Sequence, residues 1–175
     1  MTLSTNVDGT KSIIHAAESA GVKKVIFASS AAVYGDCGEI PTTEAAALIP
    51  QSPYAVSKIV GEELFRRSEI ETCSLRFFNV YGPGQSSEGG YAAVIPAFKK
   101  AISLGKECII FGDGTQVRDF IHVHDLVRII GYCLKAKHLP TEMNVASGTE
   151  TSLLDLIGTL NELNPDMLPP VFAEE

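Results

Sequence analysis

The 175-residue sequence lacks the features of membrane, secreted and nucleic-acid-binding proteins. It contains no uninterrupted apolar run of about 18 residues, the minimum for a membrane-spanning helix. No basic cluster followed by an apolar core comes after Met1, so no signal peptide is visible. Only 14 Lys and Arg stand against 21 Asp and Glu, giving a formal net charge of −7. This charge argues against a broad contact with nucleic acid or anionic membrane, and we expect a soluble, cytoplasmic protein without such partners.

Cysteine is also scarce, and its spacing fits no zinc or redox motif. The four cysteines are far apart in the sequence: Cys37, Cys73, Cys108 and Cys133. We expect reduced, partly buried thiols. His122 and His124 would lie on the same side of an extended segment, but no third ligand is near them in sequence. We therefore predict no metal site and interpret both histidines as structural.

Apolar runs rich in β-formers alternate with helical patterns along the chain. The runs that predict strands are 25–30, 73–78, 108–111, 118–123 and 143–146. The patterns that predict helices lie in 12–20, 53–67, 94–104, 125–135 and 152–163, with Asp125 and Ser152 as N-caps of the last two. This alternation favours an α/β fold with a parallel sheet and helices on both faces.

Tyr54 and Lys58 stand four residues apart near the start of the helix predicted over 53–67. They therefore lie on one helix face, one turn apart. A nearby ammonium favours the phenolate and lowers a tyrosine pKa from about 10 toward neutrality. Such a tyrosine can remove a proton from a sugar hydroxyl while hydride leaves the same carbon. Taken alone, the pair is better explained as a surface tyrosine packed on a lysine side chain.

Polar side chains also follow the strands on either side of this helix. Ser29 and Ser30 end the strand predicted over 25–30, and Asn79 follows the strand over 73–78. Open α/β sheets bind ligands at the carboxyl ends of their strands. We therefore expect the serine, the Tyr54–Lys58 pair and Asn79 to lie at one edge of the sheet.

Five motifs cover most of the chain: Asn6-Val7-x-Gly9-Thr10, Ser29-Ser30-Ala31-Ala32-Val33-Tyr34-Gly35-Asp36, Pro53-Tyr54-Ala55-Val56-Ser57-Lys58, Leu75-Arg76-Phe77-Phe78-Asn79-Val80-Tyr81-Gly82-Pro83, and Val117-Arg118-Asp119-Phe120-Ile121-His122-Val123-x-Asp125. With these motifs in this order, the chain resembles the extended short-chain dehydrogenase/reductases that act on nucleotide-sugars, most closely the UDP-glucose 4-epimerase group. The resemblance implies NAD as the cofactor and reversible hydride transfer at C4 of a nucleotide-sugar. It also implies a partial doubly wound, Rossmann-like parallel sheet with a small mixed α/β substrate lobe. Residues 1–84 would form the sheet domain and 85–175 mainly the lobe, with segments around 115–147 returning to the sheet.

The resemblance assigns roles at the catalytic and cofactor sites. Tyr54 would be the catalytic base and would also contact the cofactor, and Lys58 would be its partner and would hold the nicotinamide ribose. Ser30 would hydrogen-bond the reacting hydroxyl. Phe77 would line the nicotinamide pocket, with a place in the strand core as the equal alternative. Ser29 is better explained as a strand-end hydroxyl bonded to backbone.

The resemblance also assigns three residues to the substrate. Asn79 would contact the diphosphate or sugar, and Arg118 would pair with the diphosphate through its guanidinium fork. The alternative for Arg118 is a surface ion pair with Asp113 or Asp119. Phe111 would pack against the nucleotide base or, nearly as well, be a plain core aromatic.

The sequence departs from the family in its cofactor motif. A Gly-x-x-Gly-x-x-Gly turn is absent, and Gly112-Asp113-Gly114 does not replace it because such a loop must open a helix. There is also no acidic residue ending a second strand and no Arg-x-Gly-Asp-like segment, so the chain resembles the middle and later part of an epimerase. We expect a bare sheet edge beside residues 25–28, with weak cofactor affinity, marginal stability, or pairing in a homodimer or with another chain that supplies strands. A truncated, non-catalytic nucleotide-sugar binding or interaction fragment is the alternative.

A second departure concerns the type of reaction. Members that dehydrate or decarboxylate the sugar generally carry an acidic residue next to the catalytic serine or threonine. Here Ser30 is followed by Ala31 and Ala32. This favours epimerisation, and a dehydratase or reductase of the same family stays open.

Overall fold

The computed structural model describes residues 2–38, 40–86 and 93–174, which fall into two units. Unit 1 comprises Met1–Phe78 and His124–Ala146, and unit 2 comprises Asn79–Val123 and Ser147–Glu175. Each unit therefore combines segments that are distant in the sequence.

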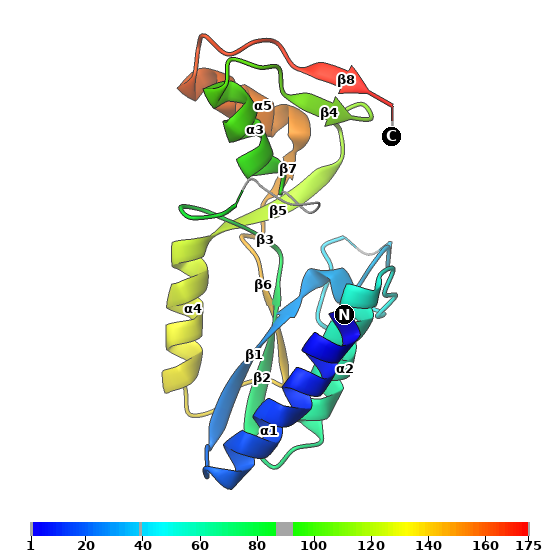
Figure 1. Cartoon of the computed structure of the whole chain (residues 1–175), viewed down its shortest axis with the longest axis vertical. Coiled ribbons are helices and arrows are strands. Elements are labelled where there is room, and N and C mark those ends of the chain that lie inside the picture. Colours follow the sequence, from blue (N-terminus) through cyan, green and yellow to red (C-terminus); the bar gives the residue numbers. More distant parts are fainter. Residues whose placement is uncertain (1, 39, 87–92, 175) are drawn as a thin grey trace. The chain divides into compact units, whose positions relative to one another are not determined.

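Unit 1 is built on a three-stranded parallel sheet in the order β1-β2-β6 (Figure 1). Its strands are β1 (Lys24–Ser30), β2 (Glu71–Phe77) and β6 (Glu142–Val145). Its helices are η1 (a π-helix, Ser4–Asp8), α1 (Gly9–Ser19), η2 (3₁₀, Ala31–Val33), α2 (Pro53–Arg66) and α4 (Val123–Lys135). Figure 1 shows α1 and α2 on one side of the strands and α4 on the other. This is the doubly wound arrangement expected from the sequence.

Helix α2 begins where the sequence predicts it and packs closely on β1. Ser52 caps the helix by accepting a hydrogen bond from the Ala55 amide at 3.1 Å, and Pro53 occupies the first turn. Gly61 faces the Phe27 ring so closely that a Cβ there would lie 2.4 Å from the ring. Phe27 also packs on Phe65, with ring centroids 5.2 Å apart. The missing side chain at position 61 thus sets how near the helix can approach the strand.

Unit 2 mixes strand directions. β3 (Asn79–Tyr81) pairs in parallel with β5 (Val117–His122), which pairs antiparallel with β7 (Glu150–Ser152). A separate parallel pair joins β4 (Ile109–Phe111) to β8 (Val171–Ala173). The helices α3 (Val94–Ser103) and α5 (Leu153–Leu163) complete the unit. Its core gathers buried side chains from α3, β4 and α5, among them Phe98, Ile110, Leu156 and Leu160.

These observations confirm the predicted α/β fold with parallel strands and correct one detail. Asp125 is not the N-cap of its helix: α4 begins at Val123, directly after β5, and Asp125 lies in the first turn, where its carboxylate meets Arg128 at 3.4 Å. An acidic side chain there still favours the helix because it faces the positive end of the helix dipole. Ser152 does cap α5, as predicted.

The four cysteines are thiols that form no disulfide. Three of them are buried and Cys37 is half-buried, as predicted. Burial raises the pKa of Cys73 to about 11. Among the described residues, no helix is long and apolar enough to cross a membrane.

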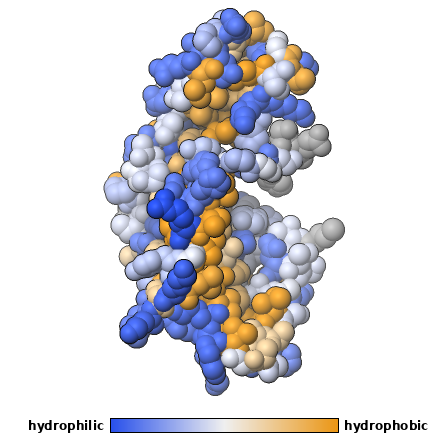
Figure 2. Space-filling view, turned by 90° about the vertical axis from the view of Figure 1, so that its left-hand side faces the viewer, coloured by the Kyte–Doolittle hydropathy of each residue, from blue (hydrophilic) through white to orange (hydrophobic). Residues whose placement is uncertain are grey.

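Two surfaces of unit 1 expose apolar side chains. On α4, Val127 and Leu134 are 59% and 57% exposed, and Figure 2, which faces this side, shows apolar residues among the hydrophilic ones. The outer edge of β1 has no strand partner within the described ranges. Ile13 on α1 is 59% exposed beside it.

Candidate functional site

Lys58 and Tyr54 lie together on α2, and Lys58 is tied to the end of β1. The Lys58 ammonium donates a hydrogen bond to the Ala28 carbonyl at 2.8 Å. Its Nζ lies 5.4 Å from the centroid of the Tyr54 ring and 5.4 Å from that of Phe27. Burial lowers the pKa of Lys58, whereas Tyr54 is 43% exposed. The pair therefore presents an accessible phenol beside a partly desolvated cation.

Ser30 and Phe77 are register partners at the carboxyl ends of β1 and β2. The Ser30 hydroxyl oxygen accepts a hydrogen bond from the Ala32 amide at 3.2 Å and so caps η2. Because this bond uses the oxygen as acceptor, the hydroxyl proton is available to a ligand. Both Ser30 and Phe77 are half-buried. The proposed role of each stays a prediction.

A groove of about 550 Å³ is lined by residues of η1, α1, β1 and α2, Lys58 among them. Asn6 in η1 donates to the Ser57 hydroxyl at 2.9 Å, and Ser57 donates to the Tyr54 carbonyl at 2.7 Å. The rest of the groove lining is largely apolar and includes Ile13, Val25, Ile26, Phe27 and Phe65. Asn6 belongs to the first sequence motif, but sequence reasoning gave it no role.

This groove fits part of a dinucleotide cofactor. A lysine, an amide and hydroxyls suit ribose hydroxyls, and the apolar wall suits a planar ring. The sequence offers no glycine-rich turn at a helix start for a pyrophosphate. The groove lining thus suits a ribose and a planar ring but offers no site for a pyrophosphate.

Ser29 does not bond to backbone, contrary to our expectation. Its side chain is buried and donates a hydrogen bond to the carboxylate of Glu62 on α2. Glu62 in turn pairs with Arg76 of β2, with Nη2 to Oε2 at 2.7 Å. The physical reason is that a buried carboxylate needs hydrogen-bond donors to replace water, and a hydrogen bond to an ionised group is stronger than one to a backbone carbonyl.

In unit 2, Asn79 and Arg118 line one cavity of about 380 Å³. The Asn79 amide donates to the Asp119 carbonyl at 2.9 Å, and Arg118 donates to the Val117 carbonyl at 2.8 Å. Further polar lining comes from Tyr81, Gln85 and Gln116. A guanidinium and an amide in such a hollow suit an anion such as a diphosphate.

The surface ion pair considered for Arg118 is not formed. Asp113 accepts from the amide and hydroxyl of Thr115. Asp119 accepts from the amides of Ser147 and Gly148, both at 2.7 Å. Neither Asp113 nor Asp119 therefore pairs with the exposed guanidinium of Arg118.

Phe111 does not join Asn79 and Arg118 in this cavity. It lies on β4 and is 57% exposed, so the alternative of a core aromatic is wrong. The two ring contacts of Tyr81, with Phe120 and His122, support the interpretation of His122 as structural. In the part of the chain that the structure describes, no group of three His, Cys, Asp or Glu could hold a metal ion.

A parallel sheet followed by a helix with Tyr-x-x-x-Lys, and with a serine at the preceding strand end, defines the class of short-chain dehydrogenase/reductases. The chain matches the NAD dependent epimerase/dehydratase family over residues 1–146 and belongs to it.

The relatives agree on nucleotide-sugar chemistry. A putative UDP-glucose 4-epimerase from Methanocaldococcus jannaschii is 39% identical over 156 residues, covering 86% of this chain and 50% of the relative. The UDP-N-acetylglucosamine 4-epimerase of Methanobrevibacter ruminantium, solved with UDP-N-acetylmuramic acid, superposes with a TM-score of 0.94 at 32% identity over 98% of this chain and 56% of the other. The UDP-glucuronic acid 4-epimerase of Bacillus cereus, solved with NAD, superposes with a TM-score of 0.84 at 30% identity, over 97% of this chain and 56% of the other. Other matches are named as a decarboxylase and a dehydratase. The chain spans about half the length of the relatives it matches.

Proposed function

We propose that this chain takes part in NAD-dependent 4-epimerisation of a nucleotide-sugar such as UDP-glucose, with Tyr54 as the catalytic base. The observation that carries the proposal is the Lys58 ammonium, held by the Ala28 carbonyl at 2.8 Å and lying 5.4 Å from the Tyr54 ring centroid. The family membership and the 4-epimerases among its relatives support it.

In this mechanism, Tyr54 takes the proton of the C4 hydroxyl. The positive charge of Lys58 stabilises the phenolate that accepts the proton, and Ser30 donates a hydrogen bond to the reacting oxygen. NAD, when bound, supplies the acceptor for the hydride that leaves C4, and Lys58, Asn6 and Phe77 would hold its nicotinamide-ribose end. Ala31 and Ala32 offer no further acid or base beside Ser30, which supports epimerisation over elimination.

In unit 2, we propose that Asn79 and Arg118 bind the diphosphate of the substrate. Both line the same cavity, and neither nearby carboxylate takes the Arg118 charge. An arginine fork and an amide donor are the groups that fix a diphosphate in orientation. Phe111 would contact the nucleotide base only from its exposed place on β4.

Two alternatives have support of their own. A dehydratase or decarboxylase function is supported by one match of each kind, and a reductase of the same family stays a prediction. A non-catalytic nucleotide-sugar binding fragment is supported by the missing glycine-rich turn, because the unit 2 cavity does not depend on that turn.

The outer edge of β1 further suggests a partner chain. The edge is unpaired within the described ranges and carries an apolar groove, and such edges pair readily. We propose a homodimer or a complex with a chain that supplies strands there. Sedimentation of the purified chain at several concentrations tests this, and a monomer throughout contradicts the homodimer.

The test of function is product analysis of the whole chain incubated with NAD and UDP-glucose. We expect UDP-galactose to form, and Tyr54→Phe to lower turnover about 10²–10⁴-fold, the usual contribution of a general base. Tyr132→Phe is the matched control, because Tyr132 is 73% exposed on α4. A product lacking water or CO₂ would favour the first alternative. UDP binding by calorimetry with no turnover and no NAD binding would favour the second.

A further inference from the structure

The interior of unit 1 contains an ion pair that the catalytic proposal does not use. Arg76 on β2 and Glu62 on α2 are 3% and 2% exposed. Two hydrogen bonds join them, from Nε to Oε1 at 3.0 Å and from Nη2 to Oε2 at 2.7 Å. This two-point geometry fixes orientation as well as distance.

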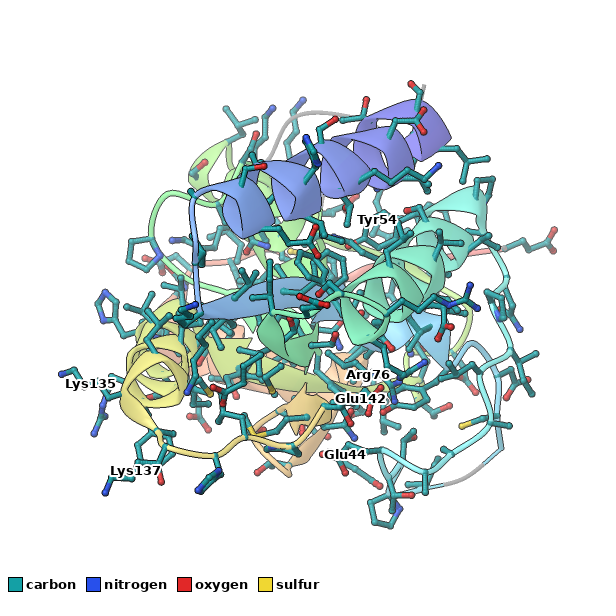
Figure 3. All side chains as sticks on the ribbon, turned by 90° about the horizontal axis from the view of Figure 1, so that it is seen from below. Glu44, Tyr54, Arg76, Lys135, Lys137 and Glu142 are labelled. Carbon is teal, nitrogen blue, oxygen red and sulfur yellow. The ribbon has the colours of Figure 1, made fainter. Side chains whose placement is uncertain are left out.

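Hydrogen bonds extend from Arg76 to the loop before α2 and, through Tyr34, to β6. Arg76 Nη1 donates to the Tyr34 hydroxyl at 2.9 Å and to the Glu44 carbonyl at 3.1 Å; Arg76 and Glu44 are labelled close together in Figure 3. The Tyr34 hydroxyl in turn donates a hydrogen bond to the side-chain oxygen of Asn144 at 2.7 Å. No buried side-chain polar atom within the described residues lacks a hydrogen-bond partner. The network therefore ties α2, β1, β2, β6 and the loop before α2 into one body.

Each anchor of this network is next to a proposed site residue. Ser29, which donates to Glu62, directly precedes Ser30, and Arg76 directly precedes Phe77. Along α2, Glu62 stands one turn after Lys58 and two turns after Tyr54, so the three share a helix face. Lys58 bonds to Ala28 and Glu62 to Ser29, so consecutive residues of β1 hold consecutive turns of α2.

Burial of charges gives no stability that apolar packing could not supply. An apolar pair cannot fix the relative orientation of the helix and the strand, because dispersion contacts tolerate sliding and rotation. A bidentate ion pair does not tolerate them. A displacement of about 1 Å at a catalytic group costs on the order of 10²-fold in rate. The network is thus suited to setting the position of the catalytic groups.

We propose that Glu62 and Arg76, linked to β1 through Ser29, are positioning residues that hold the α2 residues Lys58 and Tyr54 in place against the carboxyl end of β1. The proposal deepens the function proposed above and rests on it for its catalytic consequence.

The test compares Ser29→Ala and Glu62→Gln with the control Glu63→Gln, in the whole chain. Glu63 is the next residue on α2, but its partners Arg66 and Arg67 are exposed. Ser29→Ala leaves both charges and both Arg76–Glu62 hydrogen bonds in place, so it decides the question if Glu62→Gln fails to fold. The first readout is the pH titration of the Lys58 ε-carbon resonance, assigned with Lys58→Arg, which needs no turnover. The second is kcat and KM for UDP-glucose across pH with NAD present.

We expect the Lys58 titration in Ser29→Ala and Glu62→Gln to move toward the ordinary lysine value, because a loosened helix lets water reach the ammonium. We expect kcat to fall about 10–100-fold with KM little changed, because the substrate-binding residues lie in unit 2. Glu63→Gln should match the wild type in both readouts. Movement of the titration in a chain without turnover would uphold the positioning role and refute the epimerase function. An identical Lys58 titration in folded Ser29→Ala and wild type would overturn the positioning role, whatever the turnover.

Discussion

Replacement of Arg76 by methionine should be among the most destabilising single changes in unit 1. It removes the two hydrogen bonds to Glu62 and those to the Tyr34 hydroxyl and the Glu44 carbonyl. Glu62, 2% exposed, would keep Ser29 as its one donor among the described residues. Removal of one partner of a buried pair costs about 3–5 kcal/mol, because the other charge is left uncompensated.

The assay is urea unfolding followed by far-UV circular dichroism, since the chain has no tryptophan. With an m value of about 2 kcal/mol/M, the expected loss lowers the midpoint of the unit 1 transition by about 1.5–2.5 M. Arg67→Met is the control: Arg67 pairs with Glu63 at 2.6 Å, but the two side chains are 75% and 39% exposed. An exposed pair of this kind contributes at most about 1 kcal/mol.

A double variant separates the charge from the packing. Glu62→Met with Arg76→Met removes both charges and fills similar volume, so it should recover much of the stability that Arg76→Met loses. The reasoning is refuted if Arg76→Met costs no more than Arg67→Met, or if the double variant is as unstable as the sum of its single changes.

Three further changes test other parts of the structure. Ser152→Ala removes the cap of α5, where Ser152 accepts from the Asp155 amide at 3.0 Å, and should cost about 1 kcal/mol in thermal unfolding; no loss would contradict the cap. Gly61→Ala places a Cβ 2.4 Å from the Phe27 ring and should cost about 1–3 kcal/mol in urea unfolding despite the better helix propensity of alanine. Burial lowers the pKa of Lys58, so the unfolded state binds more protons between that folded pKa and 10.5. The stability of the wild type relative to Lys58→Met should therefore rise across this pH window in thermal melts, and a flat difference would contradict the burial.

Local features of the chain were predictable because local physics determines them. The apolar runs became β1 and β2, and Pro53 begins α2. The closeness of Tyr54 and Lys58 follows from the helical period alone. Three-residue strands such as β3, β7 and β8 were missed because they are defined by their pairing partners rather than by any run of their own.

The buried network was not predicted, although the sequence contains a signal for it. Arg76 stands within the apolar segment Leu75–Phe78, where a charge is costly unless a partner is buried with it. The sequence does not say which carboxylate is that partner, because Glu62, 14 residues away, is one of several on α2 and its flanks. Pairing across elements depends on how α2 packs against the sheet, which no local pattern contains.

Helix α2 joins these observations. Its residues at intervals of four, Tyr54, Lys58 and Glu62, pass from 43% exposed through half-buried to 2% exposed. The helix face that carries Tyr54, the proposed base, is thus also the face that anchors the helix in the core through Glu62. A single substitution on this face alters both position and stability, so loss of turnover in one variant cannot by itself assign a role. Only variants that separate positioning from stability can assign a role. Ser29→Ala leaves the charges of Glu62 and Arg76 paired. The double Glu62→Met and Arg76→Met variant restores apolar packing but not the fixed orientation of the ion pair.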